Sequence, residues 1–272
     1  SIVIPNKDHV EDLRRCIQSI VNKSTWSNYE IVVVENNSKE QSIFDYYKEL
    51  EALPQVQVVT YEGEFNYSRI NNFGVSKTRG EYLLLLNNDT EVITPDWMEQ
   101  LLMYAQRKDV GAAGAKLYYG DDTIQHAGVV IGLGAHRSAG HTHYKMPRQH
   151  LGYMGRLCYA QDVTAVTGAC LMVKKSIYEE VDGLDESFTI SLNDVDLCLK
   201  IREKGYLNIF TPFAELYHYE SKTRGMEEGE KLRRYERECA HFRDKWKEQL
   251  DAGDPYYNPN FSLDYSDFTL RF

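Results

Sequence analysis

The first 110 residues alternate short apolar runs with amphipathic stretches, and this alternation restricts the possible fold more than any other feature of the chain. The apolar runs are SIVIP, YEIVVVEN, VQVVTYE and EYLLLLNN. Between the first two, Val10, Leu13, Ile17 and Val21 recur every three or four positions, which is the spacing of a helix with one buried face. Strands that are apolar almost throughout and separated by helices are typical of a parallel sheet covered on both faces. The sequence therefore predicts an open α/β sheet.

The second half of the chain is less regular but still predicts strands and helices. The segments DVGAAGAKLYY, TIQHAGVVIG, TAVTGACLMVKK and LNIFTPFAELYHY read as strands. NDVDLCLKIREKGY reads as a helix closed by Gly205, and a charged amphipathic helix is expected over about residues 227–250. The helix in TPDWMEQLLMYAQRK is expected to start with Thr94 as N-cap and Pro95 in its first turn. The aromatic C-terminal tail, DPYYNPNFSLDYSDFTLRF, is expected to pack against the rest of the domain.

Composition and charge exclude some classes of protein. The 272 residues carry a formal charge of −10, and an acidic surface repels nucleic-acid phosphates, so no nucleic-acid partner is expected. No apolar run approaches the roughly 20 residues that span a bilayer. The chain begins with Ser1 inside a strand, which suggests a domain taken from a longer protein. Cys170 and Cys198 lie in apolar contexts that suit reduced, buried thiols. We expect a cytoplasmic protein, at most peripheral to the inner face of the plasma membrane.

Polar residues follow three of the predicted strands. Pro5-Asn6-Lys7-Asp8 follows the first, Glu35-Asn36-Asn37-Ser38 the second and Asn87-Asn88-Asp89 the fourth. Ordinary loop polarity would produce part of this pattern. In open α/β sheets, however, ligands bind outside the carboxyl ends of the strands, and these three ends predict a site at that edge.

Two phosphate-binding motifs are absent. A dinucleotide fold needs a glycine-rich turn after the first strand, and here that turn reads PNKDHVEDL without glycine. No GxxxxGK[ST] sequence occurs either. A Rossmann dehydrogenase and a P-loop nucleotidase are therefore disfavoured.

Asp89 and His218 are candidate metal ligands. A lone acid after a strand is often a turn carboxylate, but it also suits a hard divalent cation that bridges substrate phosphates. His218 ends an apolar strand, with Lys222 and Arg224 just beyond it. An imidazole beside two cations suits a diphosphate-metal pocket, although a histidine at a strand end is also commonly structural.

Asp194 and Asp196 lie at the start of a predicted helix, where the helix dipole favours carboxylates. That structural interpretation is strong for Asp196, whose neighbours look buried. Asp194 is the better candidate for a general base.

The motifs together resemble those of family 2 glycosyltransferases of the GT-A fold. The resemblance rests on SIVIPNKD, VVVENNS, LLLLNNDTEV, TGACLMV, GLDESF, NDVDLCLKIREKGY and LYHYESKTRG, in the order of the family. It is strongest to bacterial members that build O-antigen and other surface polysaccharides, which are also similar in FNYSRINNFG and DPYYNPN. It implies a single GT-A domain over residues 1–272, with a nucleotide-sugar half (about 1–110), an acceptor half (about 111–226) and a C-terminal helix and tail (about 227–272).

The resemblance also implies roles for individual residues. Those expected at the nucleotide sugar are Pro5, Glu35, Arg69, Asn72, Asn87, Asn88, Asp89, Lys222 and Arg224. Asp89 and His218 would hold Mg²⁺ or Mn²⁺, and the two cations would neutralise the leaving diphosphate. Asp194 would be the inverting base, with Asn193, Thr167 and Gly168 on the acceptor side.

Two motifs depart from the family pattern. The aspartate motif is reduced to Asn87-Asn88-Asp89, which leaves one charged metal ligand. Asn193 replaces the acid that precedes the base in relatives, which leaves acceptor preference open. With one charged ligand left in the aspartate motif, we expect the protein to bind the metal weakly and the nucleotide to supply most of the metal affinity.

The implied activity is inverting transfer of a sugar from a UDP- or dTDP-sugar to a glycan or lipid-linked acceptor. Two alternatives stay open: a sugar-phosphate nucleotidyltransferase, and a non-catalytic carbohydrate-binding domain of a larger synthase. The histidines His136, His141, His143 and His150 allow a zinc hypothesis. Their spacing matches no structural zinc motif, and a polar loop on the acceptor side is the preferred interpretation.

Overall fold

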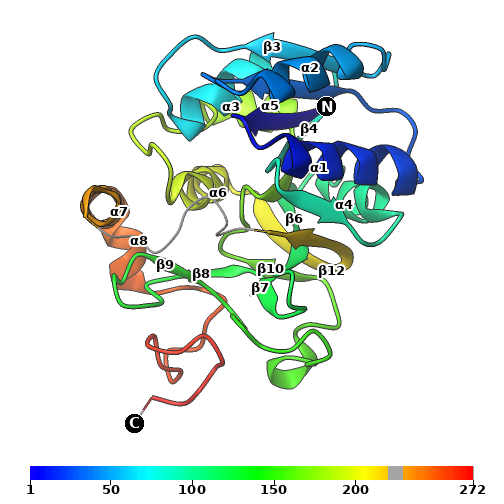
Figure 1. The fold of residues 1–272 in the computed structure, drawn as a ribbon. Coiled ribbons are helices and arrows are strands. Elements are labelled where there is room, and N and C mark those ends of the chain that lie inside the picture. Colours follow the sequence, from blue (N-terminus) through cyan, green and yellow to red (C-terminus); the bar gives the residue numbers. More distant parts are fainter. Residues whose placement is uncertain (220–228, 272) are drawn as a thin grey trace.

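The computed structural model describes residues 1–219 and 229–271 of the chain. Its first part alternates strands and helices, as the sequence predicts (Figure 1). The helix that starts at Tyr67 is capped by the Asn66 side chain, which accepts a hydrogen bond of 3.0 Å from the backbone N–H of Arg69. The elements are β1 (Ile2–Asn6), α1 (Val10–Lys23), β2 (Ile31–Glu35), α2 (Gln41–Leu50), β3 (Val56–Thr60), α3 (Tyr67–Ser76) and β4 (Tyr82–Leu86).

The second part combines short strands with helices of various lengths. Its elements up to α5 are β5 (Thr90–Val92), α4 (Trp97–Ala105), β6 (Val110–Tyr118), β7 (Ile124–His126), β8 (Val129–Ile131), β9 (Ala139–His141), a 3₁₀ turn (Tyr153–Gly155), β10 (Gln161–Val163), β11 (Cys170–Lys174) and α5 (Lys175–Glu180). They are followed by α6 (Asn193–Glu203), β12 (Leu207–His218), α7 (Glu230–Lys245) and α8 (Lys247–Ala252). Gly205, with a φ of 90°, follows the end of α6 as predicted.

The main sheet has the strand order β10-β12-β6-β11-β4-β1-β2-β3. Strands β1 to β4 run parallel to one another, and β12 runs parallel to β6. Strand β11 is antiparallel to both β4 and β6, so these two neighbours point the same way. The strands β3, β2, β1, β4, β6 and β12 therefore share one direction. This is the predicted open, mostly parallel sheet, and the carboxyl ends of these strands lie along one edge.

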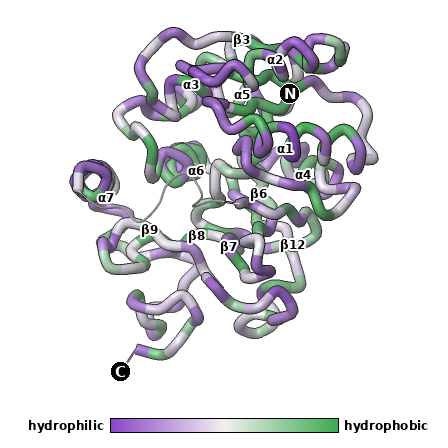
Figure 2. The backbone as a smooth tube through the Cα atoms, viewed as in Figure 1, coloured by the Kyte–Doolittle hydropathy of each residue, from purple (hydrophilic) through white to green (hydrophobic). Residues whose placement is uncertain are grey.

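Both faces of the sheet are buried. Leu83 and Leu85 of β4 belong to one apolar cluster, and Leu84 and Leu86 belong to another. Helices α1, α2 and α4 contribute to the second cluster, and α3, α5 and α6 to the first. Figure 2 shows hydrophobic residues in the interior and in α6, with mostly hydrophilic residues along α7. The leucine run is thus a central strand covered on both sides.

Helix α4 begins later than predicted. It starts at Trp97 rather than at Pro95, and Thr94 is not its N-cap. The Thr94 hydroxyl instead accepts a hydrogen bond of 2.9 Å from the backbone N–H of Glu215 in β12. A tertiary contact between the loop and the sheet has therefore replaced the local cap.

Two other predicted elements are divided. TIQHAGVVIG forms two strands, β7 and β8, because the chain turns at Gly128, whose φ is 95°. The charged C-terminal helix is divided at Trp246 into α7 and α8. The aromatic tail packs back on the body as predicted, since Tyr257 and Phe268 join a cluster with Val130 of β8.

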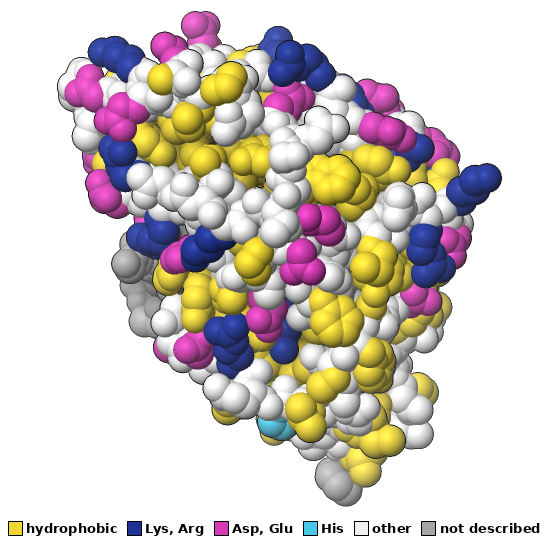
Figure 3. Space-filling view, turned by 90° about the vertical axis from the view of Figure 1, so that its right-hand side faces the viewer, with side chains coloured by type: hydrophobic (Ala, Val, Ile, Leu, Met, Phe, Trp, Pro, Cys, Tyr) yellow, Lys and Arg dark blue, Asp and Glu magenta, His cyan; other side chains and the backbone are white. Residues whose placement is uncertain are grey.

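The surface mixes charges of both signs. Figure 3 shows acidic, basic and apolar side chains interspersed over one face. None of the helices in the described residues has both the length and the apolarity needed to span a bilayer. Cys170 and Cys198 are fully buried, as predicted.

Candidate active site

Two adjoining cavities open where the main strands end. Pro5, Asn88 and Asp89 line the first, called here the Asp89 cavity. Gly168 and Asp194 line the second, the Asp194 cavity, which lies between the segment before β11 and the start of α6. The two cavities share wall residues from four segments of the chain. These are Tyr67, Asn87, Ile190 and His218.

Strand pairing brings His218 beside Asp89. Asp89 directly precedes β5, and His218, the last residue of β12, pairs with Thr90 at the start of β5. The Nε2 atom of His218 lies 3.1 Å from Oδ1 of Asp89. The two residues are far apart in sequence, but the register of β5 and β12 makes them neighbours, as the proposed ligand pair requires.

Two amides orient the His218 ring. Its Nδ1 atom lies 2.7 Å from Oε1 of Gln125, and its Nε2 atom lies 3.0 Å from Nδ2 of Asn87. An amide oxygen accepts and an amide N–H donates, so these assignments place the ring proton on Nδ1 and a lone pair on Nε2. A histidine that binds a metal through one nitrogen commonly donates the other N–H to such a partner.

The pair fits a divalent cation. In this tautomer two acceptors, Nε2 of His218 and Oδ1 of Asp89, face each other at 3.1 Å, an arrangement that a proton or a cation stabilises. One carboxylate and one imidazole are acceptable ligands for such a metal. Among the residues that the structure describes, no group of three or more acidic, histidine or cysteine side chains could hold a metal. Oxygens of a substrate or of water could supply further ligands.

Asn87 and Asn88 hold the strand end in place. Asn87 accepts a hydrogen bond of 2.9 Å from the hydroxyl of Tyr67 through Oδ1, while its Nδ2 reaches His218. Asn88 donates a hydrogen bond of 2.6 Å from Nδ2 to Oδ1 of Asn6, at the end of β1. The two amides therefore connect β4 with its neighbours, and both line the Asp89 cavity.

Asp194 lies in the first turn of α6, and two backbone N–H groups hold its carboxylate. Its Oδ2 accepts a hydrogen bond from the N–H of Gly168, and its Oδ1 accepts one from the N–H of Val195, each at 2.8 Å. A Cβ on Gly168 would lie 3.3 Å from Cβ of Asp194, so glycine permits this close approach. Asn193 is buried and donates to the carbonyl of Ile190 at 3.0 Å.

The loop before α6 is held from α7. The carboxylate of Glu238, which is 5% exposed, accepts hydrogen bonds from the backbone N–H groups of Thr189, Ile190 and Ser191 at 2.9, 3.1 and 2.9 Å. Leu192, the next residue, has a φ of 65°, a conformation that costs a non-glycine residue about 1 kcal/mol or more. The carboxylate therefore stabilises a strained segment that forms part of the Asp194 cavity.

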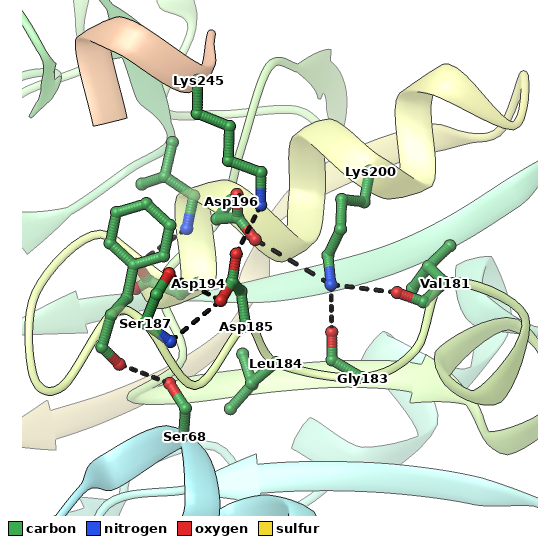
Figure 4. Close-up of polar contacts among 12 residues, drawn as sticks. Ser68, Val181, Gly183, Leu184, Asp185, Ser187, Asp194, Asp196, Lys200 and Lys245 are labelled. Atoms are coloured by element: carbon green, nitrogen blue, oxygen red, sulfur yellow. Dashed lines mark hydrogen bonds and ion pairs between the residues drawn. The ribbon is translucent and has the colours of Figure 1, made fainter. Parts of the chain in front are cut away.

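A charge network anchors α6 to the end of α7 and to Asp185 in the segment before α6 (Figure 4). Lys245 lies 2.7 Å from Asp185 and 2.6 Å from the buried Asp196, which also accepts a hydrogen bond of 2.8 Å from the indole of Trp246. Burial disfavours the charged form of Asp185, but hydrogen bonds from Lys245 and Ser187 outweigh it and lower the pKa of that carboxyl. Asp196 thus has the structural role predicted for it.

Three residues expected at the nucleotide do not line the cavities. Glu35 is buried, and its carboxylate accepts hydrogen bonds from the hydroxyl of Tyr47 and the backbone N–H of Ser38, each at 2.7 Å. Arg69 pairs with Glu186 at 3.0 Å. Other parts of the protein engage both side chains in this structure, and their contact with the nucleotide stays a prediction.

Asn72 is the third of these residues. Its Nδ2 donates to the carbonyl of Leu184 at 2.9 Å, and its Oδ1 accepts from the hydroxyl of Tyr178 at 2.6 Å. It therefore fastens the segment after α5 to α3 rather than facing either cavity.

Two cations at the Asp89 cavity were missed in the interpretation of the sequence. They are Lys231 and Arg234, in the first turns of α7, which line this cavity. The two predicted cations, Lys222 and Arg224, lie outside the described residues. The Nε atom of Arg234 is buried without a hydrogen-bond partner among the described residues. Their spacing of three residues, which puts both on one face of a helix, was the available signal.

The histidines of the 136–150 loop take separate partners. The rings of His136 and His143 contact Tyr235 and Phe268, at 5.0 and 4.9 Å between ring centres. In the described part of the chain these histidines form no metal-ligand group of three or more. His141, together with Ala139 and Gly140, lines the Asp194 cavity.

The chain is similar to known proteins over much or all of its length. The family model described as "Glycosyl transferase family 2" matches residues 1–182. The protein y4gI of Sinorhizobium fredii is 46% identical over 99% of this chain, and the O-antigen biosynthesis protein RfbC of Myxococcus xanthus is 34% identical over 100% of it. The chain spans only 30% and 21%, respectively, of the length of these two relatives.

Two solved structures share the fold at low sequence identity. A structure of GalNAc-T7 with UDP, GalNAc and Mn²⁺ is 16% identical, with a TM-score of 0.69 over 92% of this chain and 49% of that one. The mannosyltransferase PcManGT of Pyrobaculum calidifontis, solved with GDP-Man and Mn²⁺, is 14% identical, with a TM-score of 0.62 over 92% of this chain and 72% of that one.

Proposed function

The chain belongs to glycosyl transferase family 2 and has the GT-A fold, and from this premise we propose that it is an inverting transferase. The donor is a UDP- or dTDP-sugar bound in the Asp89 cavity. The acceptor is a glycan or lipid-linked sugar bound in the Asp194 cavity. The name of RfbC, an O-antigen biosynthesis protein, supports a place in the synthesis of a bacterial surface polysaccharide.

The proposed reaction is a single displacement. Asp194 accepts the proton of an acceptor hydroxyl, and the hydroxyl oxygen forms a bond to the anomeric carbon of the donor. The bond between that carbon and the diphosphate oxygen breaks on the opposite face, so the configuration inverts. The nucleoside diphosphate leaves with the electron pair of the broken bond. Since no covalent intermediate forms on the protein, one base is sufficient.

Charge on the leaving diphosphate is the main electrostatic demand of this step. Asp89 and His218 would hold a divalent cation, which when bound supplies positive charge at the diphosphate. Arg234 and Lys231 add positive charge from α7. The Nε–H of Arg234, which has no hydrogen-bond partner among the described residues, could donate to a phosphate oxygen. Lys222 and Arg224 are proposed to act on the same group.

The observation that carries the proposal is the shared wall of the two cavities. Tyr67, Asn87 and His218 face both the cavity with the candidate metal ligands and the cavity with the candidate base. A donor in one cavity and an acceptor in the other would therefore meet at this wall. A domain that only bound carbohydrate would not need an acid held by two backbone N–H groups beside a pair of metal ligands.

A thermal-shift screen tests the donor. UDP- and dTDP-sugars are added with and without Mn²⁺, and the donor that binds raises the unfolding temperature by mass action. We expect a rise with at least one of these donors that depends on Mn²⁺ and is lost in Asp89→Ala. Equal unfolding temperatures with all of them would contradict the proposed donor class.

Substitution of the base tests the chemistry. Asp194→Asn should lower nucleotide release in the presence of acceptor by about 10²- to 10⁴-fold, the usual contribution of a general base. The thermal shift produced by donor and Mn²⁺ should stay as in the wild type. Asp45→Asn on the exposed side of α2 is the matched control. Turnover of Asp194→Asn close to that of the control would refute the assignment of the base.

A further inference from the structure

His141 stands on the wall of the Asp194 cavity. It is the last residue of β9, which pairs with β8, and it lines the cavity together with Asp194 and Thr167. It comes from the histidine-rich loop, to which the proposed reaction gives no role. An imidazole at this position can donate or accept a hydrogen bond. Which of the two it does depends on its tautomer, and a second histidine ring that contacts it sets that tautomer.

That second ring is His126, at the end of β7. It is fully buried, and its Nδ1 lies 2.8 Å from Nδ1 of His141. The two rings are nearly perpendicular, with an interplanar angle of 86°. The Nε2 atom of His126 lies 3.4 Å from the backbone N–H groups of both Gly128 and Thr167. One ring thus contacts β9 on one side and the acceptor-side segment on the other.

The backbone contacts fix the protons of both rings. A backbone N–H can only donate, so Nε2 of His126 is an acceptor and the proton of a neutral ring sits on Nδ1. That Nδ1–H then donates to Nδ1 of His141, which must carry a lone pair. The proton of a neutral His141 is left on Nε2. Burial, followed by the neighbouring His141 and His218, holds the pKa of His126 well below its usual value, so this ring is neutral.

We propose that His141 is an acceptor-binding residue whose Nε2–H donates a hydrogen bond to an oxygen of the acceptor sugar, and that His126 positions it by fixing its tautomer. The bond orients the acceptor so that its reacting hydroxyl faces Asp194. No proton is exchanged with His141, which distinguishes its part from that of the base. The inference rests on the proposed glycosyl transfer only for the identity of the ligand. The tautomer pair stands on the geometry alone.

The tautomers are measured directly in the wild-type protein. With ¹⁵N-labelled histidine, two-bond proton–nitrogen correlation spectra distinguish an Nδ1–H ring from an Nε2–H ring, and His126→Phe and His141→Gln assign the signals. We expect Nδ1–H for His126 and Nε2–H for His141. In His126→Phe, His141 should become a mixture of both tautomers. An Nδ1–H or doubly protonated His141 in the wild type would overturn the proposal, whether or not the protein transfers sugars.

Kinetics test the role of the donor. The probes are p-nitrophenyl glycosides of rhamnose, galactose, mannose and N-acetylglucosamine, with the UDP- or dTDP-sugar that the wild-type protein hydrolyses fastest. His141→Leu should raise KM for the glycoside about tenfold, the value of one hydrogen bond of about 1.4 kcal/mol. Hydrolysis of the donor by water should stay within about twofold, since water needs no orienting contact.

Rescue separates binding from folding. Gln at position 141 can place an amide N–H near the position of Nε2–H, so His141→Gln should recover KM to within about threefold of wild type. His150→Leu, at an exposed histidine of the same loop, is the matched control. It should change neither the KM for the glycoside nor the rate of donor hydrolysis. An unchanged glycoside KM in His141→Leu would refute the acceptor role. A wild-type protein that turned over no donor would refute the proposed transfer instead, and the spectra would still decide the tautomer pair.

Discussion

Glu238 provides the sharpest test of how this site is built. Its carboxylate sits on α7 and accepts three backbone hydrogen bonds from the loop that precedes α6, two on Oε1 and one on Oε2. Ile190 and Ser191 of that loop line the Asp194 cavity. The perturbation is Glu238→Gln, which preserves the shape of the side chain but replaces one acceptor oxygen with an NH₂ group.

The magnitude follows from the count of acceptors. An amide can accept from only one side of the cluster, so at least one hydrogen bond to a charged group is lost, at about 1.5–3 kcal/mol. The NH₂ group then faces a backbone N–H, and the remaining bonds weaken because the negative charge is gone. We expect a loss of about 3 kcal/mol in the free energy of unfolding. At about 2–4 °C per kcal/mol for a domain of 150–250 residues, the unfolding temperature should fall by about 6 °C or more.

Calorimetry and steady-state kinetics check this expectation. Glu236→Gln, two residues away and exposed, removes the same charge from the same helix without touching the loop, and should shift the unfolding temperature by less than about 1 °C. Nucleotide release in the presence of acceptor should also fall about tenfold in Glu238→Gln, because the cavity wall loosens around Asp194. If both variants unfolded at the same temperature, the loop would not depend on this carboxylate.

Three further substitutions test the neighbouring features. Arg234→Ala should weaken binding of UDP or dTDP with Mn²⁺ about tenfold by calorimetric titration, whereas Arg237→Ala, exposed on the same helix, should leave it unchanged. Gly168→Ala should lower the rate of transfer about tenfold at unchanged nucleotide affinity, because its Cβ would meet Cβ of Asp194 at 3.3 Å. Burial lowers the pKa of His143 to about 3. As the pH falls below about 6.5, the unfolded chain therefore protonates this imidazole while the folded protein does not, and the free energy of unfolding falls. Between pH 7 and pH 5, His143→Gln should lose about 2 kcal/mol less of its free energy of unfolding than the wild type does, as measured by urea unfolding.

The strand ends could be predicted from the sequence because topology places them. An apolar run that ends in Asn87-Asn88-Asp89 must deliver these residues to the carboxyl edge of a parallel sheet. His218 also ends a strand of the same direction, so its approach to Asp89 needed only the β5–β12 register. Asp194 could be found because it lies at the start of a predicted helix and matches the position of the base in the family motif.

Residues whose role depends on side-chain direction could not be predicted in this way. Glu35 follows a strand, as Asp89 does, but its carboxylate closes its own turn onto Ser38 and Tyr47. Nothing in the sequence pattern distinguishes an acid that caps a loop from one that faces a ligand. Arg69 lies on α3, and the face it uses was set by Glu186, more than a hundred residues later.

The histidine pair is a still longer-range arrangement. His126 and His141 meet only because β8 turns back on β9 after Gly128 changes the direction of the chain. The sequence predicted one continuous strand across that glycine. The local pattern of apolar residues is the same for one strand and for two short ones, and the positive φ that separates them is decided by packing.

Helix α7 belongs to the site rather than to an appended tail. The family model ends at residue 182, before this helix, yet α7 contributes to both cavities. Arg234 lines the Asp89 cavity, and Tyr235, the next residue, lines the Asp194 cavity. Farther along, Glu238 holds the loop before the candidate base, and Lys245 neutralises the buried Asp196 of α6.

These four contacts make α7 depend on the rest of the chain and the site depend on α7. The helix is strongly polar, and an exposed polar helix has little apolar surface to hold it in place. Its buried anchors are few, among them Cys239 and Phe242, so charge pairs and backbone hydrogen bonds must fix its position. A chain cut before α7 would lose Lys245 and Trp246, the near partners of Asp196, and would keep Lys200 at 3.9 Å. Removing one partner of a buried ion pair is strongly destabilising. We therefore propose that the functional site needs α7 as well as the sheet: the fold supplies the edge of the sheet, and α7 completes the two cavities built on it.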